Sequence, residues 1–153
     1  MAITFMLMLH LLSAVVWVGG MFFAYLCLRP AAAQLLEPPQ RLPLWNATLA
    51  NFFRWVWGAV VLLLASGHGM IGLLGGMAAV GMHVHLMMLL GYLMAALYVY
   101  LFFVPFRALR QAVAAQAWPE GGARLNQIRQ IVALNLSLGL LIVVIVSAGR
   151  FLL

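Results

Sequence analysis

The chain has 153 residues, of which 67% are hydrophobic and only 7% are charged, and its net charge is +6 at neutral pH. This small number of charged residues cannot form the polar surface of a soluble domain. The composition therefore predicts an integral membrane protein and excludes a soluble one. All eight basic residues are arginines that lie between apolar runs. We interpret them as topology signals facing lipid headgroups, and we expect no nucleic-acid partner.

Four apolar runs are long enough to cross a hydrocarbon layer of ~30 Å. They cover about residues 3–28, 48–74, 78–104 and 125–150. The first run has no basic segment before it, so we expect a retained span and not a cleaved signal peptide. Because backbone polar groups inside lipid must be satisfied within the segment, each run is expected to be a helix. The sequence therefore predicts an all-α fold, with one domain over residues 1–153 that forms a four-helix up-down bundle.

The arginines fall mainly on one side of the predicted membrane. The first and third connections, with the span ends next to them, carry Arg29, Arg41, Arg54, Arg107, Arg110, Arg124 and Arg129, whereas Arg150 alone belongs to the other side. By the positive-inside rule the arginine-rich side is cytoplasmic, and both termini are expected on the periplasmic side. The only carboxylates, Glu37 and Glu120, lie in the cytoplasmic connections, so the sequence offers no paired-carboxylate site for acid–base catalysis.

The four histidines, His10, His68, His83 and His85, lie near span ends that meet on the side of the termini. His10 and His85 are each about seven residues into their spans, and His68 is about six residues from the end of its span. We therefore expect these three rings at a common depth of roughly 10 Å. His83 is two residues from His85 and points elsewhere on the helix. Imidazoles gathered inside a membrane indicate a functional site.

Two kinds of bound group fit this layer. The first is a haem b with His10 and His85 as axial ligands, His68 nearby, and Arg150 close to the propionates. Such a protein would transfer single electrons near the periplasmic face, to or from quinone or a periplasmic redox partner. If it is an enzyme, this interpretation makes it a membrane haem-dependent oxidoreductase.

The second is copper, because thioethers beside imidazoles are the ligands that Cu(I) prefers. Met82 and Met88 flank His85 at three-residue spacing. The candidate copper ligands are the four histidines, His10, His68, His83 and His85, together with Met6, Met82, Met87 or Met88. A third alternative is a structural or assembly subunit whose histidines only join helices to one another. The sequence leaves a homo-oligomer open in all three cases.

Several runs are similar to a known family. The runs HLLSAVVWVGGMFF from His10, RLPLW from Arg41 and HLMMLLGYLM from His85 resemble the CopD-like (copper resistance D) family of bacterial inner-membrane proteins, and FVPFR from Phe103 and NLSLG from Asn135 fit as well. The resemblance implies a multi-pass protein of the bacterial inner membrane with a link to copper handling. A more distant likeness to HemJ-type haem-binding membrane proteins, which carry a first-helix histidine, implies haem ligation by His10 and His85.

Overall fold

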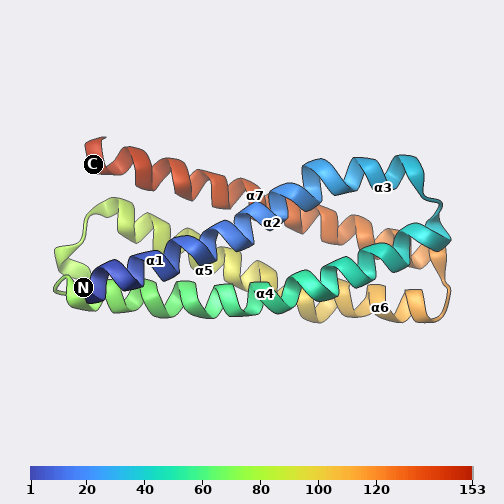
Figure 1. Ribbon diagram of the computed structural model, residues 1–153, viewed down its shortest axis with the longest axis horizontal. Coiled ribbons are helices and arrows are strands. Elements are labelled where there is room, and N and C mark those ends of the chain that lie inside the picture. Colours follow the sequence, from blue (N-terminus) through green and yellow to red (C-terminus); the bar gives the residue numbers. More distant parts are fainter. Residues whose placement is uncertain (153) are drawn as a thin grey trace.

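The computed structural model describes residues 1–152, with the side chains of residues 1–149. That part of the chain folds into four long helical rods and contains no strand (Figure 1). The first rod consists of α1 (Ala2–Ala14), α2 (Gly20–Phe22) and α3 (Arg29–Leu35), and the second rod is α4 (Pro38–Leu73). The third rod consists of α5 (Met82–Leu101) and α6 (Arg107–Ala114), and the fourth rod is α7 (Trp118–Leu152). Each rod is long and apolar enough to cross a membrane. The predicted all-α bundle of four membrane helices is confirmed.

The rods extend beyond the expected spans, because two prolines do not end their helices. The sequence interpretation ends the first span before Pro30 and the third before Pro105, but the helices continue to Leu35 and Ala114. A π-helical turn precedes Pro30, and another contains Pro105. Such wider turns shift the backbone groups that would otherwise need the missing proline N–H, so a membrane helix can pass through proline.

The first connection, between the first rod and α4, also differs from the expectation. The sequence predicts a proline-rich loop over residues 29–46, whereas the structure leaves only Leu36 and Glu37 between α3 and α4. Pro38 and Pro39 occupy the first turn of α4. A proline there costs no hydrogen bond, because the first N–H groups of a helix have no partner within it. The prolines in this stretch therefore start a helix and do not form a loop.

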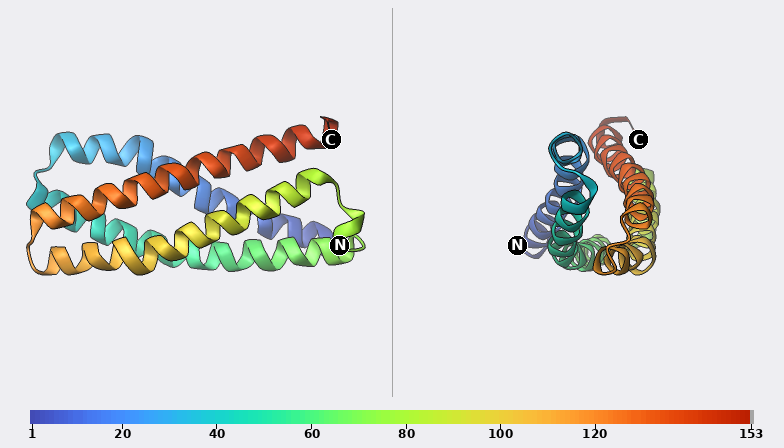
Figure 2. Two further views of the ribbon diagram at one scale, coloured as in Figure 1. Left: turned by 180° about the vertical axis from the view of Figure 1, so that it is seen from behind. Right: turned by 90° about the vertical axis from the view of Figure 1, so that its right-hand side faces the viewer.

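The rods pack as two antiparallel pairs. The helix α1 lies along α4, and α5 lies along α7 (Figure 2). Small residues let the pairs approach each other, as at the buried Gly139 of α7, where an added Cβ would lie 2.9 Å from Val18 Cγ2. Close packing of this kind holds helices together where lipid supplies no hydrophobic drive.

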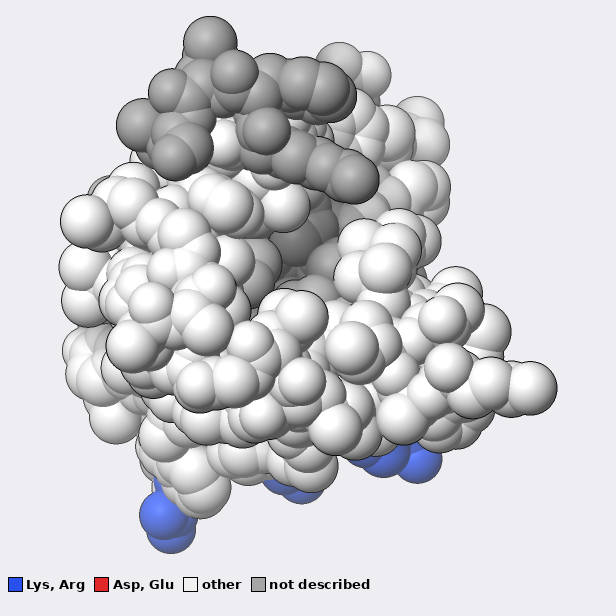
Figure 3. Space-filling model, turned by 90° about the vertical axis from the view of Figure 1, so that its left-hand side faces the viewer, with Lys and Arg blue, Asp and Glu red and all other residues white. Residues whose placement is uncertain are grey.

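The two ends of the bundle have different chemistry. The end that carries the termini also carries His10, His68, His83 and His85, and we call it the histidine end; the opposite end is the arginine end. In α4, the arginine nearest the histidine end is Arg54, about 19 residues or ~28 Å before Leu73. That arginine-free length matches the thickness of a bilayer's hydrocarbon layer. Seen from the histidine end, the described surface is uncharged except along its lower margin, and it is hollowed near its centre (Figure 3).

Asn135 forms the polar link between α7 and α5. Its side chain is buried, and its Nδ2 donates to the Met94 carbonyl at 3.2 Å, while Oδ1 has no partner. Replacing Asn135 with leucine removes this bond but also removes the unpaired oxygen, so we expect a loss of unfolding free energy below about 1 kcal/mol. Unfolding in mixed detergent micelles measures it.

Ser137→Ala is the matched control for that substitution. The Ser137 hydroxyl is exposed and donates only to the Ala133 carbonyl of its own helix, at 2.9 Å. Its removal should leave the unfolding free energy unchanged. A loss above about 2 kcal/mol for Asn135→Leu would exceed the range of interhelical bonds in membranes and contradict this account.

Candidate functional site

A cavity of about 130 Å³ lies between the two helix pairs, toward the histidine end. All four rods contribute to its wall, which is almost entirely apolar except for His10, His68 and Tyr92. Its lining consists of His10, Ala14, Trp17, Val18, Val60, Leu63, Leu64, Gly67, His68, Ile71, Met87, Met88, Gly91, Tyr92, Met94, Ala95, Gly139, Ile142 and Val143. The cavity thus brings together two imidazoles from different rods and the thioethers of Met87, Met88 and Met94.

Hydrogen bonds fix the orientation of the His10 ring. The Ser66 hydroxyl donates to the Leu62 carbonyl at 2.5 Å, so its oxygen is free to accept from His10 Nδ1–H at 3.0 Å. Both Ser66 and the ring lie where α1 crosses α4 closely: a Cβ added to Gly67 would lie 3.4 Å from His10 Cε1. With Nδ1 protonated, the lone pair of His10 stands on Nε2. A histidine held in this way is prepared for ligation through Nε2.

The His68 ring is held by two partners. Its Nδ1 donates to the Leu64 carbonyl at 2.7 Å, which leaves the lone pair on Nε2. The Tyr92 hydroxyl donates to that Nε2 and so joins α4 to α5. A metal ion can bind His68 Nε2 only after Tyr92 swings away. Tyr92 therefore covers the ligating nitrogen of His68.

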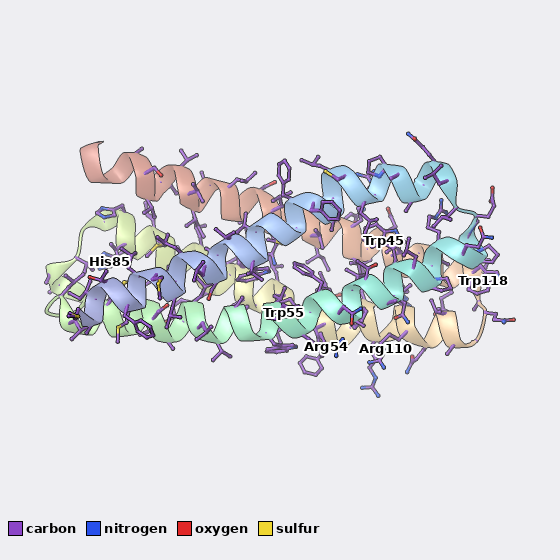
Figure 4. The ribbon with its side chains drawn as sticks, in the orientation of Figure 1. Trp45, Arg54, Trp55, His85, Arg110 and Trp118 are labelled. Carbon is purple, nitrogen blue, oxygen red and sulfur yellow. The ribbon has the colours of Figure 1, made fainter. Side chains whose placement is uncertain are left out.

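The other two histidines lie outside the lining of the cavity. His85 is in the first turn of α5, at the histidine end (Figure 4), and its Nδ1 donates to the Gly81 carbonyl at 3.1 Å. His83 packs against Gly149 of α7, where a Cβ added to Gly149 would lie 2.6 Å from the His83 Cβ. The buried Nδ1 of His83 has no hydrogen-bond partner among the residues whose side chains are described. Neither ring lines the cavity that contains His10 and His68.

His10 and His85 do not lie at the common depth that the sequence predicts, because α5 begins later than expected. The sequence interpretation starts the third span at Ala78, but α5 begins at Met82, after a turn in which Gly75 and Gly76 have φ of +101° and +91°. His85 is therefore seven residues, or ~10 Å along the helix, nearer the end than Tyr92, which contacts His68. His10 pairs in depth with His68. Arg150 lies outside the residues whose side chains are described.

Ser66, Tyr92 and Met94 are the site residues that sequence reasoning did not assign. The chain offers one signal for Ser66, which is two residues before His68 in the run Ser-Gly-His-Gly. Tyr92 follows His85 and Met88 at helical spacing of three and four residues, but nothing in that spacing indicates a bond to His68. Pairings between rods depend on how far each helix slides along its neighbour, and a hydrophobic pattern does not fix that distance.

The donors available at the cavity are two imidazoles and the three thioethers of Met87, Met88 and Met94. No group of three or more histidine, cysteine or carboxylate side chains placed to hold a metal occurs in the part of the chain that the structure describes. A site here would therefore need the methionines as ligands. Such soft ligands suit Cu(I), whereas zinc, magnesium and calcium sites use thiolate, imidazole or oxygen donors.

The comparisons with known proteins agree with the membrane architecture. The family profile described as "CopD: Copper resistance protein D" matches residues 46–148, which include α5, most of α4 and most of α7. No curated protein and no solved structure matches the chain. The matched region covers most of the chain and three of its four rods, including His68, Met87, Met88 and Tyr92. The chain is a multi-pass inner-membrane protein and belongs to the CopD family of copper resistance proteins.

Proposed function

We propose that this protein binds copper as Cu(I) in the cavity toward its histidine end and takes part in copper handling across or at the inner membrane. The observation that carries the proposal is the convergence of His10, His68, Met87 and Met88 on one small apolar cavity. The family match supports it, because the family is described by copper resistance. In this proposal the histidine end faces the periplasm, as the arginine distribution indicates.

The chemistry of the wall favours a singly charged soft cation. A low-dielectric cavity penalises charge strongly, and no carboxylate among the described residues lines it to balance a divalent ion. Cu(I) carries one charge and bonds well to neutral thioethers and imidazoles. In this proposal His85 and Met82, which lie nearer the end of the bundle, would bind the ion before it reaches the inner ligands. His83 is more remote from that route, because it packs against α7.

Haem b remains a prediction from the sequence, and the cavity does not fit it well. Its volume of about 130 Å³ is below the roughly 300 Å³ at which pockets for organic ligands begin. His85, the second axial ligand in that interpretation, does not line it.

One preparation tests copper against the other interpretations. The purified protein in neutral detergent, reduced and free of oxygen, is titrated with Cu(I) in competition with a chromophoric Cu(I) chelator. We expect one Cu(I) per chain and sulfur scattering around copper in X-ray absorption. A Soret band in the visible spectrum of the freshly purified protein would favour haem instead. Neither copper binding nor a Soret band would leave the histidines as structural links between helices.

Tyr92→Phe is expected to strengthen Cu(I) binding about fivefold. The tyrosine hydroxyl occupies His68 Nε2, and a bond worth roughly 1 kcal/mol must break before a metal binds there. Phenylalanine keeps the ring and removes that competition. Chelator competition measures the affinity.

Tyr100→Phe serves as the control for Tyr92→Phe. The Tyr100 hydroxyl accepts from Gln127 Nε2 at 3.1 Å, away from the cavity, so its loss should not change the affinity. Equal or weaker Cu(I) binding by Tyr92→Phe would show that His68 is not a ligand, or that Tyr92 itself assists binding.

A further inference from the structure

A second, larger pocket lies at the arginine end and plays no part in copper binding. Its volume is about 380 Å³, and it lies among the second half of the first rod, the start of α4 and the start of α7. Its lining consists of Met21, Ala24, Tyr25, Arg29, Ala33, Pro38, Arg41, Leu42, Trp45, Leu49, Phe52, Trp118, Pro119, Gly122, Leu125, Asn126, Ile128, Arg129 and Val132. Three arginines from three different rods thus converge on one apolar pocket.

These three guanidinium groups have no carboxylate partner in the part of the chain that the structure describes. The one ion pair found there joins Arg124 to Glu120 at 3.8 Å. Neither of these two residues lines the pocket. Arg29 stacks over the Tyr25 ring, with Cζ 4.9 Å from the ring centre, and so is held at the pocket wall. Arg29 and Arg41 are both half-buried. The pocket therefore carries an unbalanced positive charge.

The pocket is also polar at one end and apolar at the other. Met21, Phe52 and Val132 lie at the level where the arginine-free zone ends, whereas Arg29 is about two turns or ~12 Å further out along the first rod. Trp45 and Trp118 both lie toward the arginine end (Figure 4) and line this outer region. Tryptophans and arginines are typical of the headgroup layer of a bilayer. The pocket thus runs from the hydrocarbon boundary into the headgroup layer.

We propose that this pocket binds one anionic phospholipid of the surrounding leaflet. The phosphate would lie among Arg29, Arg41 and Arg129, and the upper part of the acyl chains would lie against Met21, Phe52 and Val132. A volume of 380 Å³ accommodates a headgroup with the beginning of its chains, and the remaining chain length would extend into the bilayer. Basic pockets between membrane helices on the cytoplasmic side suit acidic lipid headgroups.

The remaining arginines at this end provide a matched comparison. Arg54, Arg107 and Arg110 are exposed and do not line the pocket, and Figure 4 shows Arg54 and Arg110 along a different edge of the bundle. Replacing either set of three by glutamine lowers the net charge by the same amount. A lipid attracted only by overall charge would respond equally to both triple variants.

The test measures lipid binding to the full chain in neutral detergent. Phosphatidylglycerol, phosphatidylcholine and inorganic phosphate are each titrated at fixed ionic strength, and binding is followed by native mass spectrometry and by the midpoint of thermal unfolding. We expect phosphatidylglycerol to bind and to raise the midpoint above that seen with phosphatidylcholine. The variant R29Q/R41Q/R129Q should bind it at least about tenfold more weakly (~1.4 kcal/mol). The variant R54Q/R107Q/R110Q should keep most of the affinity.

Three results would overturn the proposal. Equal weakening by the two triple variants would reduce the effect to general charge attraction. Full competition by inorganic phosphate at the same concentration would identify a soluble anion as the occupant. Equal binding of phosphatidylcholine would show that the arginines do not select the headgroup. Lipid binding by the two triple variants is measured without copper, so its outcome tests this proposal independently of the proposed function.

Discussion

Replacing His10 by asparagine is expected to weaken Cu(I) binding about a hundredfold or more. The ring is the proposed ligand from α1, and its Nε2 is made available because Nδ1–H is donated to Ser66. Ser66→Ala removes only that support and should cost about tenfold, since the loss of a partner behind a ligating histidine lowers metal affinity by roughly 10–100-fold. His10→Asn should weaken binding more than Ser66→Ala, because it removes the proposed ligand itself and not only the group that orients it. Competition with a Cu(I) chelator measures both.

His83→Asn is the matched control for His10→Asn. His83 is also a half-buried histidine at the histidine end, but it packs between Gly81 and Gly149 and does not line the cavity. We expect its replacement to leave Cu(I) affinity unchanged. If His83→Asn weakened binding as much as His10→Asn, the ligands would have to be sought nearer the end of the bundle. Circular dichroism of each variant verifies that the helices are retained.

Membrane insertion and helix number follow from composition, and the sequence was sufficient to predict them. Most exposed residues of the spans are apolar, for example Val15, Leu89 and Val144, which are 68%, 65% and 61% exposed. In water such surfaces would be unfavourable, so the bilayer is the solvent that the sequence requires. The ends of the helices were harder to predict, because Pro30 and Pro105 end helices in water but are accommodated by π-helical turns here.

The histidine layer was predicted in outline and not in detail. Sequence spacing indicated that the imidazoles gather at one end, and His10 and His68 do line a common cavity. The predicted partner of His10 was His85, because the start of α5 was placed four residues too early. A shift of one helical turn moves a side chain ~5.4 Å along the axis, which is more than the length of a metal–ligand bond. Depths estimated from sequence are therefore less accurate near a helix start than near a helix centre.

The arginines illustrate a different limit. Interpreted one at a time, Arg29, Arg41 and Arg129 are ordinary topology signals, and nothing in their spacing relates them. They lie 12 and 88 positions apart in sequence order but converge because the first rod, α4 and α7 meet at the arginine end. Convergence of residues from separate rods is a property of the packing and becomes visible only in the folded bundle.

The largest expected loss of stability comes from Tyr98→Ala. Tyr98 is 2% exposed and lies at the centre of the bundle, where α5 faces the first rod and α4. Its ring packs edge-on against Trp17, Phe53 and Trp57 at centroid distances of 6.0, 5.5 and 5.1 Å, and its hydroxyl donates to the Phe53 carbonyl at 3.0 Å. Removing the ring leaves a cavity, so we expect the free energy of unfolding to fall by about 3 kcal/mol or more. Unfolding in mixed micelles measures it.

Two further substitutions separate the ring from the hydroxyl and from general effects of truncation. Tyr98→Phe keeps the packing and should cost only about 1 kcal/mol, since one hydrogen bond is lost. Tyr100→Ala removes a ring that is 46% exposed and should cost less still. Equal losses for Tyr98→Ala and Tyr100→Ala would contradict a central role. Because Trp17 also lines the cavity proposed to bind Cu(I), loosening this aromatic cluster should lower Cu(I) affinity as well, although no proposed ligand has been changed.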